Sequence, residues 1–302
     1  MIELCFGDQM DPDGYDYLRQ LRQAARDPRY LRWLPGSHER VSFPLHGYTW
    51  VEDNRVIGNL TLIPFYHKDR WLYLIANVAV HPDFRRQGIA RHLTQKALNH
   101  IRDHGASSAW LQVREENQAA IDLYLSLGMI KRSHRTTWLS TADLPEEKTA
   151  DAGISVRPRR PKDWTDQRTW LGNCYPPQVS WNLSLDVDAF KPSLYNRINQ
   201  FINHEKRTHW AVTWHDKLIG VSTWDPSRRY ADNLWLAAGP ALTEEAIFHM
   251  LDHARRTLPQ RQPLMVNFSS SASKAPFLNA GFKLLNTLIW MEMKFKTPNQ
   301  PD

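Results

Sequence analysis

Apolar and polar residues alternate along several stretches in the first half of the chain. A period of two is typical of a strand with one buried face. The stretch at residues 48–64 also includes a polar turn, which indicates a hairpin. The pattern predicts strands within residues 2–6, 48–64, 71–80, 110–113 and 136–139.

Elsewhere in the same half, apolar residues recur three or four positions apart, which is the spacing of one helix face. This spacing predicts helices at residues 15–25, 88–103 and 118–127. Residues 26–46 are rich in proline, arginine and histidine, and we expect them to be irregular or to form a short helix.

The second half of the chain repeats part of this order. Residues 210–220 resemble residues 48–58 at an offset of 162 positions, and each copy reads as strand, polar turn and strand. Residues 270–281 resemble residues 117–128 at an offset of 153 positions. The second copy has therefore lost nine residues between these two anchors.

A length of 302 residues favours two domains, in agreement with the repeat. A polar stretch that contains Pro145 and Gly153 separates the two copies. We therefore predict a first domain at residues 1–141, a linker at 142–153 and a second domain at 154–297.

Composition favours a soluble protein. Hydrophobic residues make up 42% of the chain and its mean hydropathy is −0.56. No apolar run approaches the roughly 20 residues that a transmembrane helix needs, and no signal peptide is visible. Two cysteines, Cys5 and Cys174, lie far apart and suit reduced thiols better than a disulfide framework. We expect a cytoplasmic protein.

The chain has a formal net charge of +6 and an isoelectric point of about 9.3. This balance fits either nucleic-acid binding or the attraction of a polyanionic cofactor. Basic residues are spread along the chain, apart from a short cluster at residues 157–162, and no nucleic-acid-binding motif is visible. We therefore expect a polyanionic small molecule rather than nucleic acid.

Residues 78–91, Val-Ala-Val-His-Pro-Asp-Phe-Arg-Arg-Gln-Gly-Ile-Ala-Arg, carry the strongest chemical signal. An apolar strand ends at Val80, a turn follows, and a helix opens near Gly88. A helix start offers unpaired backbone N–H groups and the positive end of the helix dipole. Gly88 and Ala90 keep side chains out of the way, so a diphosphate can approach the backbone. The neighbouring arginines add charge-assisted contacts.

The R-x-x-G-x-A string at residues 85–90 resembles the acyl-CoA pyrophosphate loop of the GCN5-related N-acetyltransferases, the GNAT superfamily. The string from Asn117 to Met129 is similar to the second family signature, N-x-x-A-x-x-L-Y-x-x-L-G-F, with Met129 in place of phenylalanine. Asn117 is also a favourable helix N-cap, and Gly128 lies where a C-cap glycine belongs. The two signatures identify the first domain as a member of this superfamily.

The resemblance implies an α/β (α+β) fold with two tandem GNAT-like domains. Each would hold a mixed, mostly antiparallel, splayed sheet with helices on both faces. Acetyl-CoA would be the acyl donor and would lie in the splay. The implied acetyl-CoA contacts are Val78, Ala79, Val80, Arg85, Arg86, Gln87, Gly88, Ile89, Ala90, Arg91, Asn117 and Tyr124.

The implied reaction is direct attack of an amine on the thioester. The resemblance assigns the general acid to Tyr124, which would protonate the departing thiolate. The general base is unknown, because Gln112 occupies the position where related ribosomal-protein N-terminal acetyltransferases carry a glutamate. A neutral amide cannot act as a general base. Glu115, Glu116 and His46 are open alternatives.

The second copy lacks the chemistry of the first. Residues 234–243 contain no arginine-rich turn and no R-x-x-G-x-A string. Glu244 and Glu245 lie at the expected helix start, where they would repel a diphosphate. Phe277 stands in the place of the tyrosine. We interpret residues 154–297 as a degenerate GNAT-like domain.

The acceptor is expected to be a primary amine of a small molecule or of a peptide amino terminus. The expected acceptor wall comprises Trp33, His38, Glu39, Arg40 and His46. No metal is expected, because His100 and His104 have a metal-binding spacing but no evident third ligand. A homodimer is compatible with the sequence. The alternative function, a non-catalytic acyl-CoA-sensing or partner-binding module, is favoured by Gln112 and opposed by Tyr124.

Overall fold

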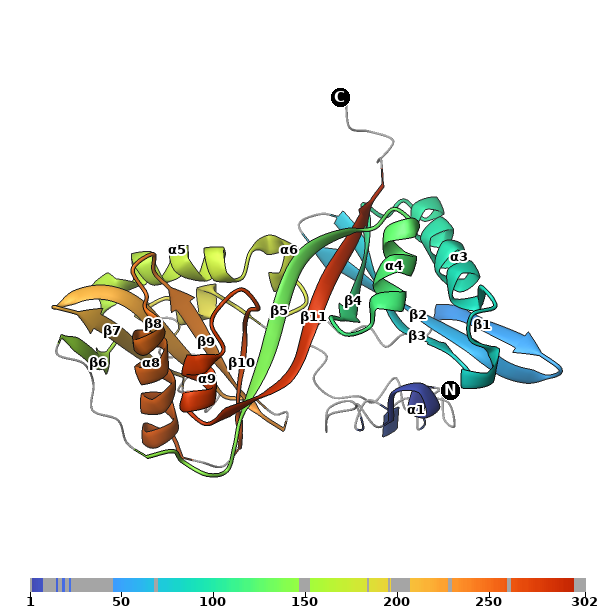
Figure 1. Ribbon diagram of the computed structural model, residues 1–302. Coiled ribbons are helices and arrows are strands. Elements are labelled where there is room, and N and C mark those ends of the chain that lie inside the picture. Colours follow the sequence, from blue (N-terminus) through green and yellow to red (C-terminus); the bar gives the residue numbers. More distant parts are fainter. Residues whose placement is uncertain are drawn as a thin grey trace. The chain divides into compact units, whose positions relative to one another are not determined.

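The computed structural model describes residues 2–7, 15, 18–19, 22, 46–67, 70–146, 153–183, 185–194, 196, 207–227, 230–259 and 262–295. The chain divides into two compact units. Unit 1 combines Met1–Arg132 with Ile289–Asp302, and unit 2 comprises Ser133–Leu288. Each unit is a sheet with helices packed against it (Figure 1).

In unit 1 the strands follow the order β1-β2-β3-β4-β11. Their bounds are His46–Glu52 for β1, Arg55–His67 for β2, Arg70–Val80 for β3, Ser108–Arg114 for β4 and Phe282–Lys294 for β11, whose last part belongs to this unit. The first three strands pair antiparallel, whereas β3 and β4 pair parallel. The sheet is therefore mixed, as the family resemblance implies.

Two helices build the core of unit 1 against this sheet. Helix α3 (Ile89–Asp103) buries its apolar stripe, and helix α4 (Gln118–Ser126) buries Ile121 and Tyr124. Short helix α1 (Ile2–Phe6) contacts β3. The apolar residues whose spacing predicted α3 are the ones that the helix buries, so the periodicity and the packing agree.

In unit 2 the strands follow the order β5-β10-β9-β8-β7-β6. Their bounds are Ile130–Ser140 for β5, Leu264–Ser269 for β10, Asp232–Ala238 for β9, Lys217–Asp225 for β8, Thr208–Trp214 for β7 and Ile154–Pro158 for β6. The helices are α5 (Trp164–Cys174), α6 (Pro177–Ser180), α8 (Glu244–Thr257) and α9 (Ala275–Asn279). Single 3₁₀ turns, η3, η4 and η5, lie at Pro82–Phe84, Pro161–Asp163 and Asp188–Phe190.

The boundary between the units falls inside two long strands. Strand β5 begins in unit 1 and ends in unit 2, and β11 begins in unit 2 and ends in unit 1. The predicted domain bounds, 1–141 and 154–297, stay a prediction. The two compact units of the structure have different bounds, between Arg132 and Ser133 and between Leu288 and Ile289. The division differs because a sequence repeat follows chain order, whereas strand pairing joins residues far apart in the chain.

Two hairpins at the repeat positions share their local geometry. The first turns at Asp53 and Asn54, and the second at His215 and Asp216; all four residues have positive φ. Each hairpin shows a register shift at the same place, after Trp50 in the first and at the position 162 residues later in the second. A two-residue turn with positive φ at both positions suits the twist of paired strands.

The N-terminal segment is helical rather than extended, so the prediction of a strand at Ile2–Phe6 is wrong. Five residues are too few for periodicity to distinguish the two states. Glu3 lies in the first turn, where an acid favours a helix, and it pairs with Arg22. The described residues of predicted helix 15–25 are helical, and predicted segment 26–45 lies outside the described residues.

Candidate functional site

The loop from β3 to α3 forms a tight entry to a helix. A 3₁₀ turn at Pro82–Phe84 follows the strand, and Gly88 is the N-cap of α3 with φ of 81°. Arg86 also has a positive φ, of 64°. No side chain caps this helix start, so the backbone N–H groups of its first turn stay free of an internal partner among the described residues.

The buried side chain of Ile89 anchors the end of this loop in the core of unit 1. Ile89 is buried, whereas Arg85, Arg86 and Gln87 are exposed. The Arg85 Nε donates to the carbonyl of Val80 at 3.3 Å. These side chains and the free amides of residues 89–91 lie at the positive end of the α3 dipole, which suits a polyanion.

A side-chain contact links the two helices that carry the family signatures. The Arg91 Nη2 on α3 donates to the Ser126 Oγ at the end of α4, at 2.7 Å. Asn117 opens α4, and its side chain accepts a hydrogen bond from the Ala120 N–H at 3.2 Å. Gly128 has φ of 90°, so the C-cap glycine predicted from the sequence is confirmed.

Strands β3 and β4 separate next to this loop. Their ladder runs from Leu72↔Ser108 to Ile75↔Leu111, yet β3 continues to Val80 and β4 to Arg114. The pairing of β3 with β2 shifts register in the same region, where Asn77 has φ of 53°. The splay implied by the family fold therefore begins after Ile75.

The register shift is stabilised by two asparagines that the sequence analysis did not single out. The Asn59 Nδ2 donates to the Asn77 carbonyl at 3.1 Å, and the Asn77 Nδ2 donates to the Thr61 Oγ1 at 3.2 Å. Asparagine tolerates a positive φ better than most residues. An asparagine inside an apolar strand is the feature of the sequence that could have indicated this register shift.

The predicted contact strand and the predicted acid share one core. Val78 and Val80 pack against the cluster that contains Ile89 and Tyr124. Burial raises the pKa of the Tyr124 hydroxyl to about 12. A tyrosine with such a pKa stays protonated at neutral pH and can donate a proton. The carbonyl of Val80 also accepts contacts from Arg85 and the Cys5 thiol.

The carboxylates near the base position do not enter this core. Gln112 is half-buried on β4, while Glu115 and Glu116 are exposed. Glu116 forms an ion pair with Arg114 at 3.4 Å. His46 is exposed at the start of β1 and acts electrostatically on His100, at the opposite end of α3 from Gly88.

The helix histidines are explained by packing. The rings of His100 and His104 stack with centroids 4.0 Å apart, and the Tyr48 hydroxyl lies 2.9 Å from the His100 Nδ1. Burial, followed by the charges of His104 and His46, lowers the pKa of His100. No group of three or more metal-ligating side chains occurs in the described part of the chain.

In unit 2, the corresponding helix α8 has an N-terminus that is capped by a side chain. The Thr243 hydroxyl accepts from the Ala246 N–H at 3.2 Å, and Glu244 and Glu245 lie in the first turn of α8. Phe277, at the repeat position of Tyr124, stacks on Trp138 with centroids 4.7 Å apart. The start of α8 is therefore capped from within and carries two negative charges.

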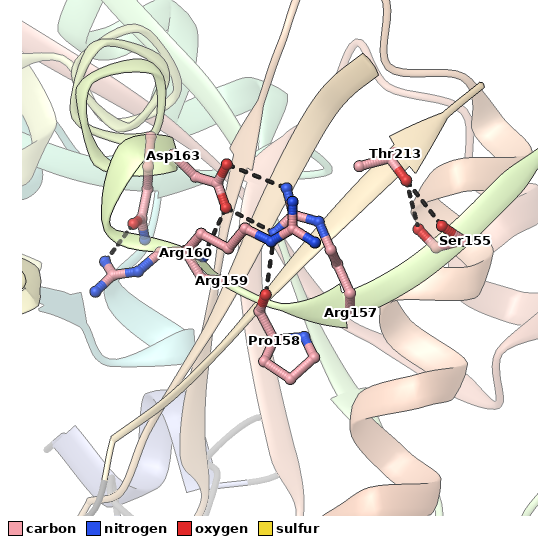
Figure 2. Close-up of polar contacts among 8 residues, drawn as sticks. Ser155, Arg157, Pro158, Arg159, Arg160, Asp163 and Thr213 are labelled. Atoms are coloured by element: carbon pink, nitrogen blue, oxygen red, sulfur yellow. Dashed lines mark hydrogen bonds and ion pairs between the residues drawn. The ribbon is translucent and has the colours of Figure 1, made fainter. Parts of the chain in front are cut away.

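The basic cluster at residues 157–162 is partly used inside unit 2 (Figure 2). Arg157 donates two hydrogen bonds to the Asp163 carboxylate, at 2.7 and 3.1 Å. Arg159 donates to the Gln167 Oε1 at 2.6 Å and to the Phe190 carbonyl at 2.7 Å. Two arginines of the cluster are thus satisfied by protein groups.

One ion pair that holds a buried carboxylate was also missed from the sequence. Glu292 on β11 is 5% exposed, and its Oε2 accepts from the Arg132 Nε at 2.6 Å. A lone carboxylate within the apolar run Trp290-Met-Glu-Met was the signal, because a buried charge needs a partner.

Residues 14–129 match the model of the acetyltransferase (GNAT) family. The alanine N-acetyltransferase of ribosomal protein bS18 from Escherichia coli is 39% identical over 71 residues, which cover 24% of this chain and 48% of that relative. Mycothiol acetyltransferase of Thermobifida fusca is 47% identical over 51 residues, which cover 17% of this chain and 16% of that relative.

The family model matches the first part of the chain. Residues 14–129 are similar to the acetyltransferase (GNAT) family, as the two signatures predicted. The aligned stretch spans about half the length of the Escherichia coli relative. A GCN5-related N-acetyltransferase from Sphaerobacter thermophilus aligns with a TM-score of 0.49 and 12% identity, over 80% of this chain and 78% of that chain. No helix among the described residues is long and apolar enough to cross a bilayer.

Proposed function

We propose that the protein is an acetyl-CoA-dependent N-acyltransferase that moves an acetyl group to a primary amine of a small molecule or an amino terminus. The observation that carries this proposal is the uncapped start of α3 behind Gly88, next to a splayed strand pair and a buried tyrosine. The family match supports the same chemistry.

The diphosphate of the acyl donor would be held by the first-turn amides of α3, with Arg85, Arg86 and Arg91 around it. Each amide would contribute a charge-assisted hydrogen bond, and the helix dipole adds to the attraction. The backbone of residues 78–80 would accompany the pantetheine arm in the splay. Unit 2 would hold no second donor, because Glu244 and Glu245 occupy its equivalent helix start.

The chemical step would be direct transfer without a covalent enzyme intermediate. The amine nitrogen forms a bond to the thioester carbon, the carbon–sulfur bond breaks, and Tyr124 gives its proton to the departing thiolate. One proton of the acceptor ammonium must leave for the amine to attack. Gln112 can hold a water or the acceptor by hydrogen bonding but cannot take this proton.

Two measurements test the proposal. Calorimetry measures acetyl-CoA binding, and a free-thiol assay over a panel of amines, including short peptides, measures transfer. Binding together with thiol release on an amine supports the enzyme. Binding without release on any amine favours the second candidate, an acyl-CoA-sensing module, for which Gln112 is the supporting observation. No binding contradicts both.

A charge placed at the helix start should abolish binding. Gly88→Glu adds a carboxylate at the proposed phosphate position, and we expect acetyl-CoA affinity to fall by about a hundredfold or more. Gly105→Glu is the matched control, because Gly105 also has a positive φ and a Cβ there meets no atom within 4 Å. Equal affinities of the two variants would contradict the assigned diphosphate site.

A further inference from the structure

The end of β11 lies along β4, the strand that carries Gln112. The two strands are neighbours in the sheet, and the Phe295 N–H donates to the Ser107 carbonyl at 3.0 Å. The last residues of β11 therefore lie beside the first residues of β4, so the strands run antiparallel. This register places Glu292 opposite Trp110, and Trp290 opposite Gln112.

Burial confirms which side chains share a face. Alternate residues of both strands, Leu111 and Val113 on β4 and Ile289 and Met291 on β11, belong to the same core cluster. Because side chains alternate between the faces of a sheet, Gln112 and Glu292 both project from the opposite face. They are diagonal neighbours on adjacent strands, a relation that separates Cβ atoms by about 7–8 Å or somewhat less.

Glu292 is also chemically suited to take a proton. Its side chain is 6% exposed, and its Oε2 accepts one hydrogen bond from Arg132. Its Oε1 has no hydrogen-bond partner among the described residues. If a water bridges Gln112 and the Glu292 carboxylate, the proton of the acceptor can pass to Glu292 through that water.

We propose that Glu292 is the proton acceptor for the amine substrate, replacing the glutamate that the first signature region lacks at Gln112. This inference rests on the proposed acetyltransferase function. The residue comes from the last strand of the chain, more than 150 residues after Tyr124 in sequence. The site would therefore be completed by β11, which lies outside both family signatures.

The proton balance is as follows. The acceptor ammonium gives one proton, through a water held by Gln112, to Glu292, and the free amine attacks the thioester carbon. The carbon–sulfur bond then breaks, and the departing thiolate takes the hydroxyl proton of Tyr124. The attacking nitrogen loses its second proton, and this proton restores the hydroxyl of Tyr124. The products are the amide, the free thiol of CoA and one proton, released from Glu292.

The test compares isosteric variants at Glu292 and Gln112. We expect Glu292→Gln to lower kcat by about a hundredfold or more while acetyl-CoA affinity stays within about twofold. The double variant Q112E/E292Q should regain at least about tenfold of that loss, because it restores a carboxylate at the family position. Glu52→Gln, at an exposed carboxylate on β1 of the same unit, should keep wild-type kcat.

A purely structural role of the Glu292–Arg132 pair gives a different pattern. Arg132→Gln breaks the same ion pair but keeps the carboxylate, so we expect it to retain kcat even where Tm falls. Equal loss of kcat in Arg132→Gln and Glu292→Gln, or no rescue by Q112E, would overturn the inference. If Glu292→Gln does not fold, the double variant E292M/R132L, which removes both charges together, is compared instead, and wild-type kcat in that variant overturns the inference. Absence of turnover in the wild-type protein would refute the proposed function itself.

Discussion

At the residue scale, burial determines what Tyr124 and His209 can do. The hydroxyl of Tyr124 loses its hydration in the core of unit 1, so its ionised form is disfavoured and its pKa rises to about 12. The same effect acts in the opposite direction on His209 of unit 2, because burial disfavours its charged form. Its pKa falls to about 3, and the charges of Arg159 and Arg207 add to the shift.

Tyr124→Phe removes the proposed acid with little change in volume. We expect kcat to fall by about a hundredfold to a thousandfold while acetyl-CoA affinity is retained. Because the pKa is raised, Tyr124 stays protonated as the pH rises to 10, so loss of its proton does not limit the wild-type rate there. Initial rates from pH 6 to 10 measure both effects. Tyr66→Phe, at an exposed tyrosine, is the control, and equal rates for Tyr124→Phe and the wild type would contradict the assignment.

His209 should make unit 2 sensitive to acid. Its folded pKa of about 3 lies below the ordinary histidine pKa of 6.5, so the unfolded chain binds a proton that the folded chain does not. Stability is therefore lost as the pH falls from about 6.5 toward about 3. We expect His209→Asn to reduce the difference in unfolding free energy between pH 7 and pH 4.5 by about 2 kcal/mol. Urea titrations test this, with His215→Asn at an exposed turn position as control.

At the element scale, each hairpin glycine lets a helix approach a strand closely. A Cβ on Gly58 would lie 2.9 Å from the Ile89 Cγ2 and 3.1 Å from the Leu93 Cδ1, both on α3. A Cβ on Gly220 would lie 2.9 Å from the Leu242 Cδ1, just before α8, and 3.3 Å from the Met250 Sδ on α8. The repeat therefore preserves the same packing device in both units, although only the first has an uncapped helix start.

This pair allows a matched experiment. Gly58→Ala and Gly220→Ala should each lower stability by about 1–3 kcal/mol, because the added methyl group forces neighbouring side chains to move. Only Gly58→Ala should also weaken acetyl-CoA binding, since it displaces Ile89 at the start of α3. Thermal unfolding and calorimetry measure the two effects. If Gly220→Ala weakened acetyl-CoA binding and Gly58→Ala left it unchanged, the placement of the donor in unit 1 would be contradicted.

At the scale of the whole molecule, the second part of β11, from Ile289 onward, belongs to the first unit. Ile289 and Met291 are 5% and 0% exposed and lie in the core that contains Tyr124. Truncating a buried side chain of this kind costs about 2–5 kcal/mol. A total stability of about 5–15 kcal/mol, typical of a domain, does not tolerate the loss of a whole core strand.

A fragment of residues 1–141 tests this division. It contains both family signatures and corresponds to the first predicted domain, but it lacks β11. We expect it to be insoluble or to unfold without a cooperative transition, and co-expression with residues 142–302 should restore soluble protein. Circular dichroism and thermal melts provide the measurement. A stable 1–141 fragment that binds acetyl-CoA would show that β11 is dispensable.

The sequence by itself determined the local features of this protein. Helix α3, the N-cap at Asn117, the glycine end of α4 and the loop before Gly88 each depend on residues close together in the chain, so periodicity and capping chemistry predicted them. The short helix at Ile2–Phe6 was missed because five residues carry too little periodicity.

Only the tertiary structure decided which distant residues meet. The pairing of β11 with β4, the position of Glu292 near Gln112 and the ion pair of Glu292 with Arg132 follow from packing. Strand pairing is specified by backbone hydrogen bonds that any sequence can form, together with burial that depends on the whole core. The residues that face each other across such a sheet therefore have no common signature in the chain.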